Sequence, residues 1–87
     1  MAKNRGFDME KITVLSQLAV NQKARILQIN GGFGFQRRLK VMGIREGQII
    51  KVVSRQPFRG PFTIAIGGSN ITIGRGMANK IAVEVLR

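Results

Sequence analysis

The fold of this chain is decided by a glycine-rich turn that runs into a short basic helix. The stretch reads Asn30-Gly31-Gly32-Phe33-Gly34-Phe35-Gln36-Arg37-Arg38-Leu39-Lys40-Val41-Met42-Gly43. Its first three glycines let the backbone take positive φ values where a strand turns sharply into the next element. Neither nucleotide-binding pattern fits, because the dinucleotide pattern needs a glycine where Arg37 stands and the phosphate-loop pattern needs Lys-Ser/Thr after Gly34. The glycines therefore predict a tight turn.

The apolar residues that follow predict a helix over about residues 34–42. Phe35, Leu39 and Met42 recur at i, i+4 and i+7, which is the spacing of one buried helical face. The face turned away from them is basic, and its cations are Arg37, Arg38 and Lys40. Gly43 is expected to end the helix as its C′ residue, and a basic last turn suits the negative end of the helix dipole. Such a helix is a candidate binding surface.

Composition limits the class of protein and of partner. With 87 residues and 44% apolar content the chain forms one domain, and without cysteine it must be held by packing alone. A net charge of +11 calls for an anionic partner, which leaves nucleic acid, anionic lipid and an acidic protein face open. No stretch reaches the ~20 apolar residues of a membrane span. Asp8 and Glu10 interrupt any secretory signal. We expect a cytoplasmic protein, peripheral at the inner face of the membrane if its charge serves lipid.

The chain is expected to divide into a flexible basic tail and one folded domain. Residues 1–12 are polar, charged and aperiodic, which predicts the tail, and residues 13–87 form the domain. Lys3, Arg5 and Lys11 in the tail could keep the chain near an anionic leaflet. Leu15–Leu18 is expected to form a single helical turn.

Five short strands are expected in the domain. They are residues 23–30, 48–55, 62–66, 71–73 and 81–86, with a helical turn or irregular connector over 74–80. Asn21 is expected in the left-handed conformation of a tight turn. The alternation of inward and outward residues slips after Ile26, which predicts a β-bulge. The fold class is therefore all-β, a small SH3-like barrel with one short helix and short helical turns, and closure would remove its exposed sheet edges. An OB-type barrel is the alternative.

The residue inventory argues against catalysis and against a bound metal or cofactor. The chain has no His, Cys, Tyr or Trp, and nothing in the spacing pairs its four acids, Asp8, Glu10, Glu46 and Glu84. Without a base the serines cannot be activated, and without imidazole, thiolate or clustered carboxylates a tight metal site lacks ligands. We therefore expect no enzyme activity, no catalytic residue, no cofactor and no metal ligand.

The remaining candidates are residues for partner binding. They are Arg37, Arg38, Lys40, Arg45, Phe58 and Arg59. The first three lie on the basic helix, where a solvated charged face is the competing interpretation, and Arg45 lies in the turn that follows it. Phe58 and Arg59 lie between two prolines that stiffen the 56–61 loop, and a large apolar side chain at a rigid loop tip is often an anchor. The competing interpretation of Phe58 is a lid that folds back over the barrel.

Several motifs together resemble one known family. They are Leu15-Ser16-x-Leu18, Lys23-Ala24-Arg25-Ile26, Gly31-Gly32, Arg37-Arg38-Leu39-x-x-Met42-Gly43-Ile44-x-x-Gly47, Pro57-Phe58-x-Gly60-Pro61 and Lys80-Ile81. In one register over about residues 13–86 they resemble the ferrous iron transport protein A family, FeoA. The resemblance implies an SH3-like barrel in the cytoplasm. It also implies an accessory role beside FeoB, a membrane transporter for ferrous iron that carries a cytosolic GTP-binding domain.

Three hypotheses for function follow. The first is a non-enzymatic adaptor that binds FeoB and modulates iron uptake. The second is a small nucleic-acid-binding barrel, which the charge favours and the lack of Tyr and Trp stacking platforms weakens. The third is a regulatory domain for a metal-dependent repressor, because related domains occur in such proteins. The chain departs from the family at Val20-Asn21, where the family often has Pro-Gly.

Overall fold

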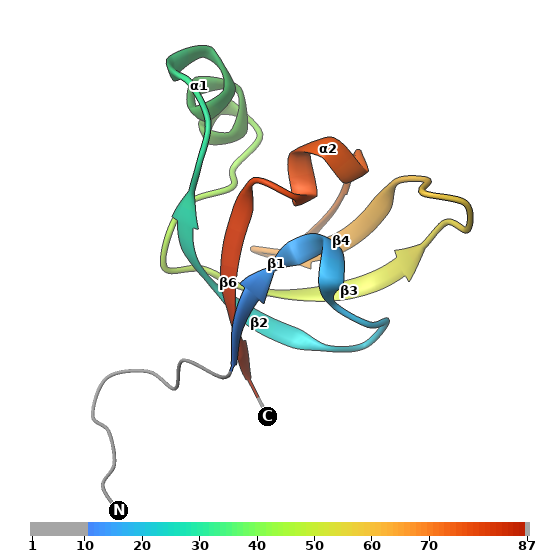
Figure 1. Ribbon diagram of the computed structural model, residues 1–87. Helices are drawn as coiled ribbons and strands as arrows, with labels where there is room; N and C mark the ends of the chain where they lie inside the picture. The colour runs from blue at the N-terminus through green and yellow to red at the C-terminus, as the bar shows by residue number, and fades with distance from the viewer. Residues whose placement is uncertain (1–10, 87) are drawn as a thin grey trace, which may run out of the picture.

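The computed structural model describes residues 11–86 and shows a small, strongly bent β-barrel (Figure 1). Its strands are β1 (Ile12–Val14), β2 (Lys23–Ile29), β3 (Ile49–Arg55), β4 (Phe62–Ile66), β5 (Ser69–Ile73) and β6 (Ile81–Leu86). The helical elements are η2 (Leu15–Gln17), α1 (Phe33–Val41) and α2 (Arg75–Ala78). All strand pairs are antiparallel, in the order β1-β6-β2-β3-β4-β5. The all-β, SH3-like fold class is confirmed.

The structure adds one strand to the five expected. Strand β1 pairs with β6, so that Ile12 lies opposite Glu84 and Val14 opposite Ala82. Ile12, the last residue of the expected tail, therefore belongs to the sheet. Residues 1–10 of that tail lie outside the described residues.

The sheet contains two β-bulges, of which the sequence predicted the one in β2 but not the one in β3. The register of β2 against β6 shifts between Ile26 and Gln28, which confirms the expected bulge. A second bulge, between Val52 and Ser54 in β3, was not expected. Asn21 has φ 74°, as predicted for a tight turn.

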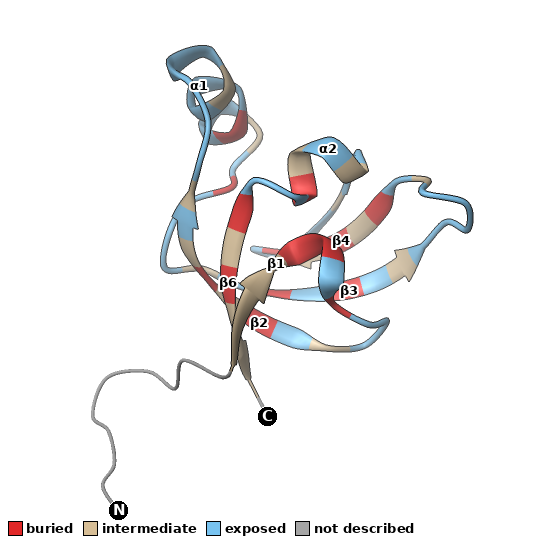
Figure 2. Cartoon of the chain, in the orientation of Figure 1, coloured by how far each residue is buried: buried red, intermediate tan, exposed pale blue. Residues whose placement is uncertain are grey.

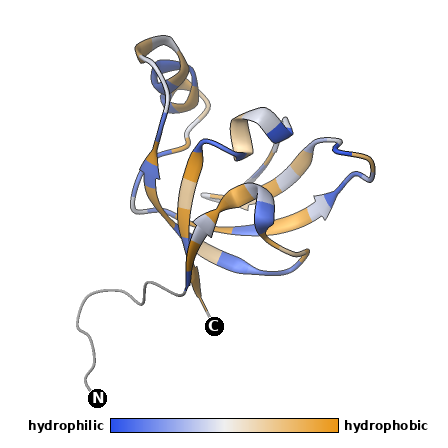
Figure 3. Ribbon diagram, in the orientation of Figure 1, coloured by the Kyte–Doolittle hydropathy of each residue, from blue (hydrophilic) through white to orange (hydrophobic). Residues whose placement is uncertain are grey.

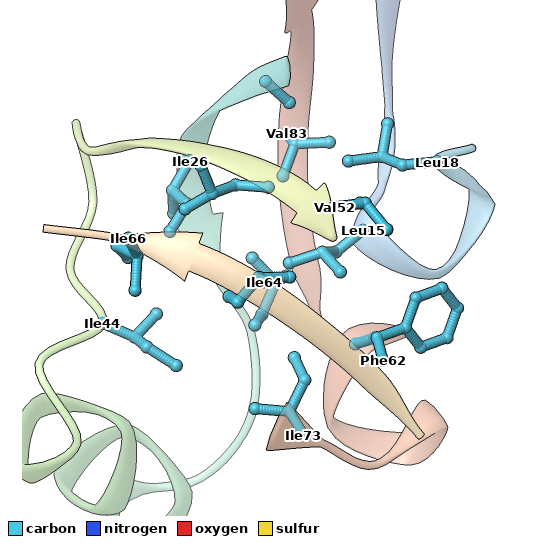
Figure 4. Packing of buried hydrophobic residues seen from close by; sticks show 14 of the residues in the cluster. Leu15, Leu18, Ile26, Ile44, Val52, Phe62, Ile64, Ile66, Ile73 and Val83 are labelled. Carbon is cyan, nitrogen blue, oxygen red and sulfur yellow. The ribbon is translucent and has the colours of Figure 1, made fainter. Parts of the chain in front are cut away.

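The hydrophobic core is formed by the inward-facing side chains of strands β2 to β6 (Figure 4). Strand β4 alternates buried Phe62, Ile64 and Ile66 with half-buried Thr63 and Ala65, the two-residue period of a half-buried strand. Leu15 and Leu18 enter the core from the single helical turn that the sequence predicted. Packing of these aliphatic side chains, without any disulfide, holds the barrel together.

Hydrogen bonding does not close the barrel, which corrects the expectation of full closure. Strands β1 and β5 end the sheet and do not pair with each other. Helix α2, which follows β5, packs instead on η2, which follows β1. The Ser16 hydroxyl donates a hydrogen bond to Oδ1 of Asn79 across this contact. Side-chain packing thus covers the seam between the two end strands.

Candidate functional site

Helix α1 projects from one side of the barrel, and the turn that leads into it uses its glycines in three different ways (Figure 1). Gly31 has φ +131°, as a sharp turn requires. Gly32 is the extended N-cap residue, with φ −78°, and Gly34 lies inside the helix. Of the three glycines expected to permit positive φ at the turn, only Gly31 uses it, whereas Gly34 lies in the helix, as the predicted range of 34–42 implied.

The C-terminal end of α1 is a Schellman motif, which confirms Gly43 as the C′ residue. Gly43 has φ +91°, and its N–H donates to the Lys40 carbonyl at 3.0 Å. The Ile44 N–H donates to the Leu39 carbonyl at 2.9 Å, and the side chains of both residues are buried. This motif turns the chain back under the helix and places Ile44 next to Leu39.

Of the predicted apolar face of α1, only Leu39 is fully buried. Phe35 and Met42 are half-buried and pack at the edge of the core. The Lys80 ammonium lies 4.9 Å from the centroid of the Phe35 ring, so a cation covers part of this aromatic face. One deeply inserted leucine is thus the main anchor of α1.

Two exposed polar side chains brace α1 and the following loop against the end of β2. Gln36 donates from Nε2 to the carbonyls of Ile29, at 3.2 Å, and Gly31, at 3.1 Å. Oε2 of Glu46 accepts a hydrogen bond from the Ile29 N–H at 3.3 Å. Both backbone polar groups of Ile29 are therefore satisfied by side chains, and these contacts fix the helix over the strand end.

A groove of about 580 Å³ is lined by the end of β2, helix α1 and the loop that follows α1. Its lining comprises Ile29, Phe33, Gln36, Arg37, Lys40, Ile44, Arg45 and Glu46. Three of these residues are apolar and three are cations, whereas the single acid, Glu46, is engaged with the Ile29 amide. We call this site the α1 groove. A lining that combines apolar side chains with cations suits an acidic segment that carries an apolar side chain.

The structure separates the six predicted site residues into different places. Arg37, Lys40 and Arg45 meet in the α1 groove. Arg38 is exposed on α1 but does not line the groove. Phe58 and Arg59 lie in the loop between β3 and β4, on the opposite side of the barrel from α1 (Figure 1).

Sequence reasoning missed the apolar contribution to this site. Phe33 is 94% exposed and Val41 83% exposed, on a helix that is mostly solvent-facing (Figure 2). Together with Arg37 they stand at i, i+4 and i+8, so they share one outward face. That spacing was a usable signal, but Phe33 was assigned to the turn. Of the two apolar residues only Phe33 lines the groove, and an exposed apolar residue of this size at a groove typically marks an interaction site.

The two acids of residues 11–86, Glu46 and Glu84, lie apart from each other, in the α1 groove and on β6. Within residues 11–86, no three His, Cys, Asp or Glu side chains lie close enough to hold a metal ion. Glu84 pairs with Arg25 at 3.6 Å, on the barrel wall. None of the helices in residues 11–86 is long and apolar enough to cross a membrane.

Comparison with known proteins identifies relatives of this chain. The FeoA domain family model matches residues 13–85. A Methanocaldococcus jannaschii protein assigned as an Fe(2+) transport protein A is 48% identical over 59 residues, which cover 68% of this chain and 70% of that protein. An Fe(2+) transport protein A/Fe(2+) transporter FeoB fusion protein of Porphyromonas gingivalis is 35% identical over 72 residues, 83% of this chain but 8% of the fusion. The crystal structure of an iron uptake regulatory protein (FeoA) superposes with a TM-score of 0.80 at 32% identity, over 86% of this chain and 99% of the other.

Proposed function

Because the chain belongs to the FeoA family, whose members are involved in Fe(2+) transport, we propose that it is a non-enzymatic accessory protein of ferrous iron uptake. Its partner is a FeoB-type ferrous iron transporter, and the contact is made at the cytoplasmic side of the membrane. The α1 groove is the surface that binds the transporter. Iron is the cargo of the transporter in this proposal and is not held by this chain.

The proposal is supported most by the α1 groove, in which three apolar residues and three cations line one pocket on a member of this family. The P. gingivalis relative supports the choice of partner, because there a transport protein A segment and FeoB are parts of one chain. Fusion holds two partners at high effective concentration, which is useful only when they act at the same place.

The chemistry of the groove indicates what it recognises. Arg37, Lys40 and Arg45 attract a negatively charged segment and raise its rate of encounter. Phe33, Ile29 and Ile44 then bury an apolar side chain of that segment, which slows dissociation. The braces from Gln36 and Glu46 hold the groove in one shape before binding, which lowers the entropic cost of association.

Ferrous iron uptake by cells tests this proposal directly. In a strain that lacks the chromosomal copy of this chain, wild-type protein is expected to restore uptake, whereas the double variant Arg37→Glu/Lys40→Glu is not. The matched control is Lys23→Glu/Lys51→Glu, which changes the net charge equally. Lys23 and Lys51 are exposed neighbours on β2 and β3, away from the groove lining. Full restoration by the groove variant would contradict the proposal.

A further inference from the structure

The loop between β3 and β4 holds an unusual pair of residues at its tip. Phe58 and Arg59 both have positive φ, 58° and 66°. Two consecutive residues with positive φ are typical of a type I′ turn, where Asn-Gly is the usual pair because these residues tolerate that conformation. For a bulky residue such as phenylalanine a positive φ is a rare, strained conformation. Strain of this kind points to a role for the side chain that is displayed.

The loop below the tip is tightly built. The Gly60 N–H donates to the Pro57 carbonyl at 3.2 Å, and the Gln56 N–H donates to the Pro61 carbonyl at 3.0 Å. A Cβ atom at Gly60 would lie 2.5 Å from Cβ of Gln56, so only glycine fits this close approach. The two prolines add further rigidity. The tip is therefore presented in one fixed shape.

The tip is apolar and its surroundings are cationic. Phe58 is 98% exposed, and Figure 3 shows a hydrophobic segment bordered by hydrophilic ones at the end of this loop. The guanidinium carbons of Arg55 and Arg75 lie 5.0 and 5.3 Å from the ring centroid of Phe62, at the base of the loop. Arg59, next to Phe58 in the loop, is a third cation. The two acids of residues 11–86, Glu46 and Glu84, lie instead in the α1 groove and on β6.

We propose that this loop docks the protein on an anionic lipid membrane, with the Phe58 ring inserted among the lipid headgroups and Arg55, Arg59 and Arg75 above the surface. We call it the membrane tip. Charge complementarity with an anionic leaflet selects the lipid, and an aromatic side chain beside cations matches the interface, where apolar and polar groups meet. The proposal is separate from the α1 groove, which lies on the opposite side of the barrel.

A lipid surface fits this tip better than a protein does. Phe58 protrudes alone, and the groove that a protein segment could fill lies elsewhere. A bilayer accepts a single protruding side chain without a preformed pocket. The net charge of +11 adds long-range attraction to the same surface, and the tip would give that attraction a fixed orientation.

Tryptophan fluorescence can report insertion without background, because the chain has no Trp or Tyr. Phe58→Trp is expected to shift its emission to the blue when vesicles of phosphatidylglycerol and phosphatidylcholine in equal parts are added. Pure phosphatidylcholine vesicles should give little shift. The matched control is Phe33→Trp, which is almost as exposed but lies on α1, and its emission should stay unchanged. Equal shifts at both positions, or none at position 58, would overturn the proposal.

Vesicle sedimentation of the full chain measures how much the tip contributes. Phe58→Asn is expected to weaken binding to the phosphatidylglycerol vesicles about tenfold, through loss of apolar burial. Arg59→Gln is expected to weaken it about fivefold, through loss of one surface cation. Phe33→Asn should bind as wild type. Asparagine accepts positive φ readily, so Phe58→Asn should keep the fold. Wild-type vesicle binding by Phe58→Asn, with a loss of transporter binding instead, would reassign the tip to a protein contact.

Discussion

Leu39→Ala is expected to lower the free energy of unfolding by about 2–5 kcal/mol, the cost of a cavity in a well-packed core. Leu39 is fully buried and is the only residue of α1 that is. It also accepts, through its carbonyl, the Ile44 N–H bond of the Schellman motif. Small domains have only about 5–15 kcal/mol of stability in total, so the loss should be visible as a large shift in urea midpoint.

The same helix provides the control for this variant. Val41→Ala also truncates an aliphatic side chain in α1, but Val41 is 83% exposed. Its effect should stay within about 0.5 kcal/mol, as for most surface substitutions. If the two variants were equally destabilised, α1 would not be anchored by Leu39, and the groove that it supports could not be rigid.

Phe33→Asn is expected to weaken binding to the transporter roughly 10- to 100-fold, because burial of a phenylalanine side chain contributes about 1.5–3 kcal/mol. The change should be seen mostly as faster dissociation, since the ring acts after encounter. Phe33 is the first residue of α1 and is 94% exposed, so stability should change little.

Phe58→Asn is the matched control for this effect. It removes an equally exposed phenylalanine from the membrane tip, on the other side of the barrel. With the transporter in a neutral lipid environment, it should bind as wild type does. A loss of affinity in Phe58→Asn equal to that in Phe33→Asn would mean that the two surfaces form one interface.

Much of the fold could be predicted because its signals are local. The alternation in β4 and the last strand, the slip after Ile26 and the role of Gly43 each depend on a few neighbouring residues, and the structure confirms them. Strand β1 was missed because three residues carry too little periodicity. Its existence depends on pairing with β6, almost the whole chain length away.

Only the part of the candidate site that depends on neighbouring residues could be predicted from the sequence. The basic face of α1 follows from helical spacing, but the groove also needs Ile29 before the helix and Ile44 after it. Those residues meet only because of the Gly31 turn, the Schellman motif and the brace from Glu46 to the Ile29 amide. The barrel topology also determines that helix α1 and the Phe58 loop lie on opposite sides of the molecule. The spacing of these residues along the sequence does not reveal this separation.

The central claim, that the α1 groove binds a FeoB-type transporter, is tested most directly by association kinetics with matched charge reversals. The full chain is passed over the intact transporter held in neutral-lipid nanodiscs. Arg37→Glu/Lys40→Glu is expected to lower the association rate constant about tenfold or more, because it reverses the charge that steers encounter. Lys23→Glu/Lys51→Glu, with the same net charge and both changes outside the groove, should associate nearly as wild type does. Equal losses in both variants, or unchanged binding in the first, would contradict the assignment of the α1 groove as the docking surface.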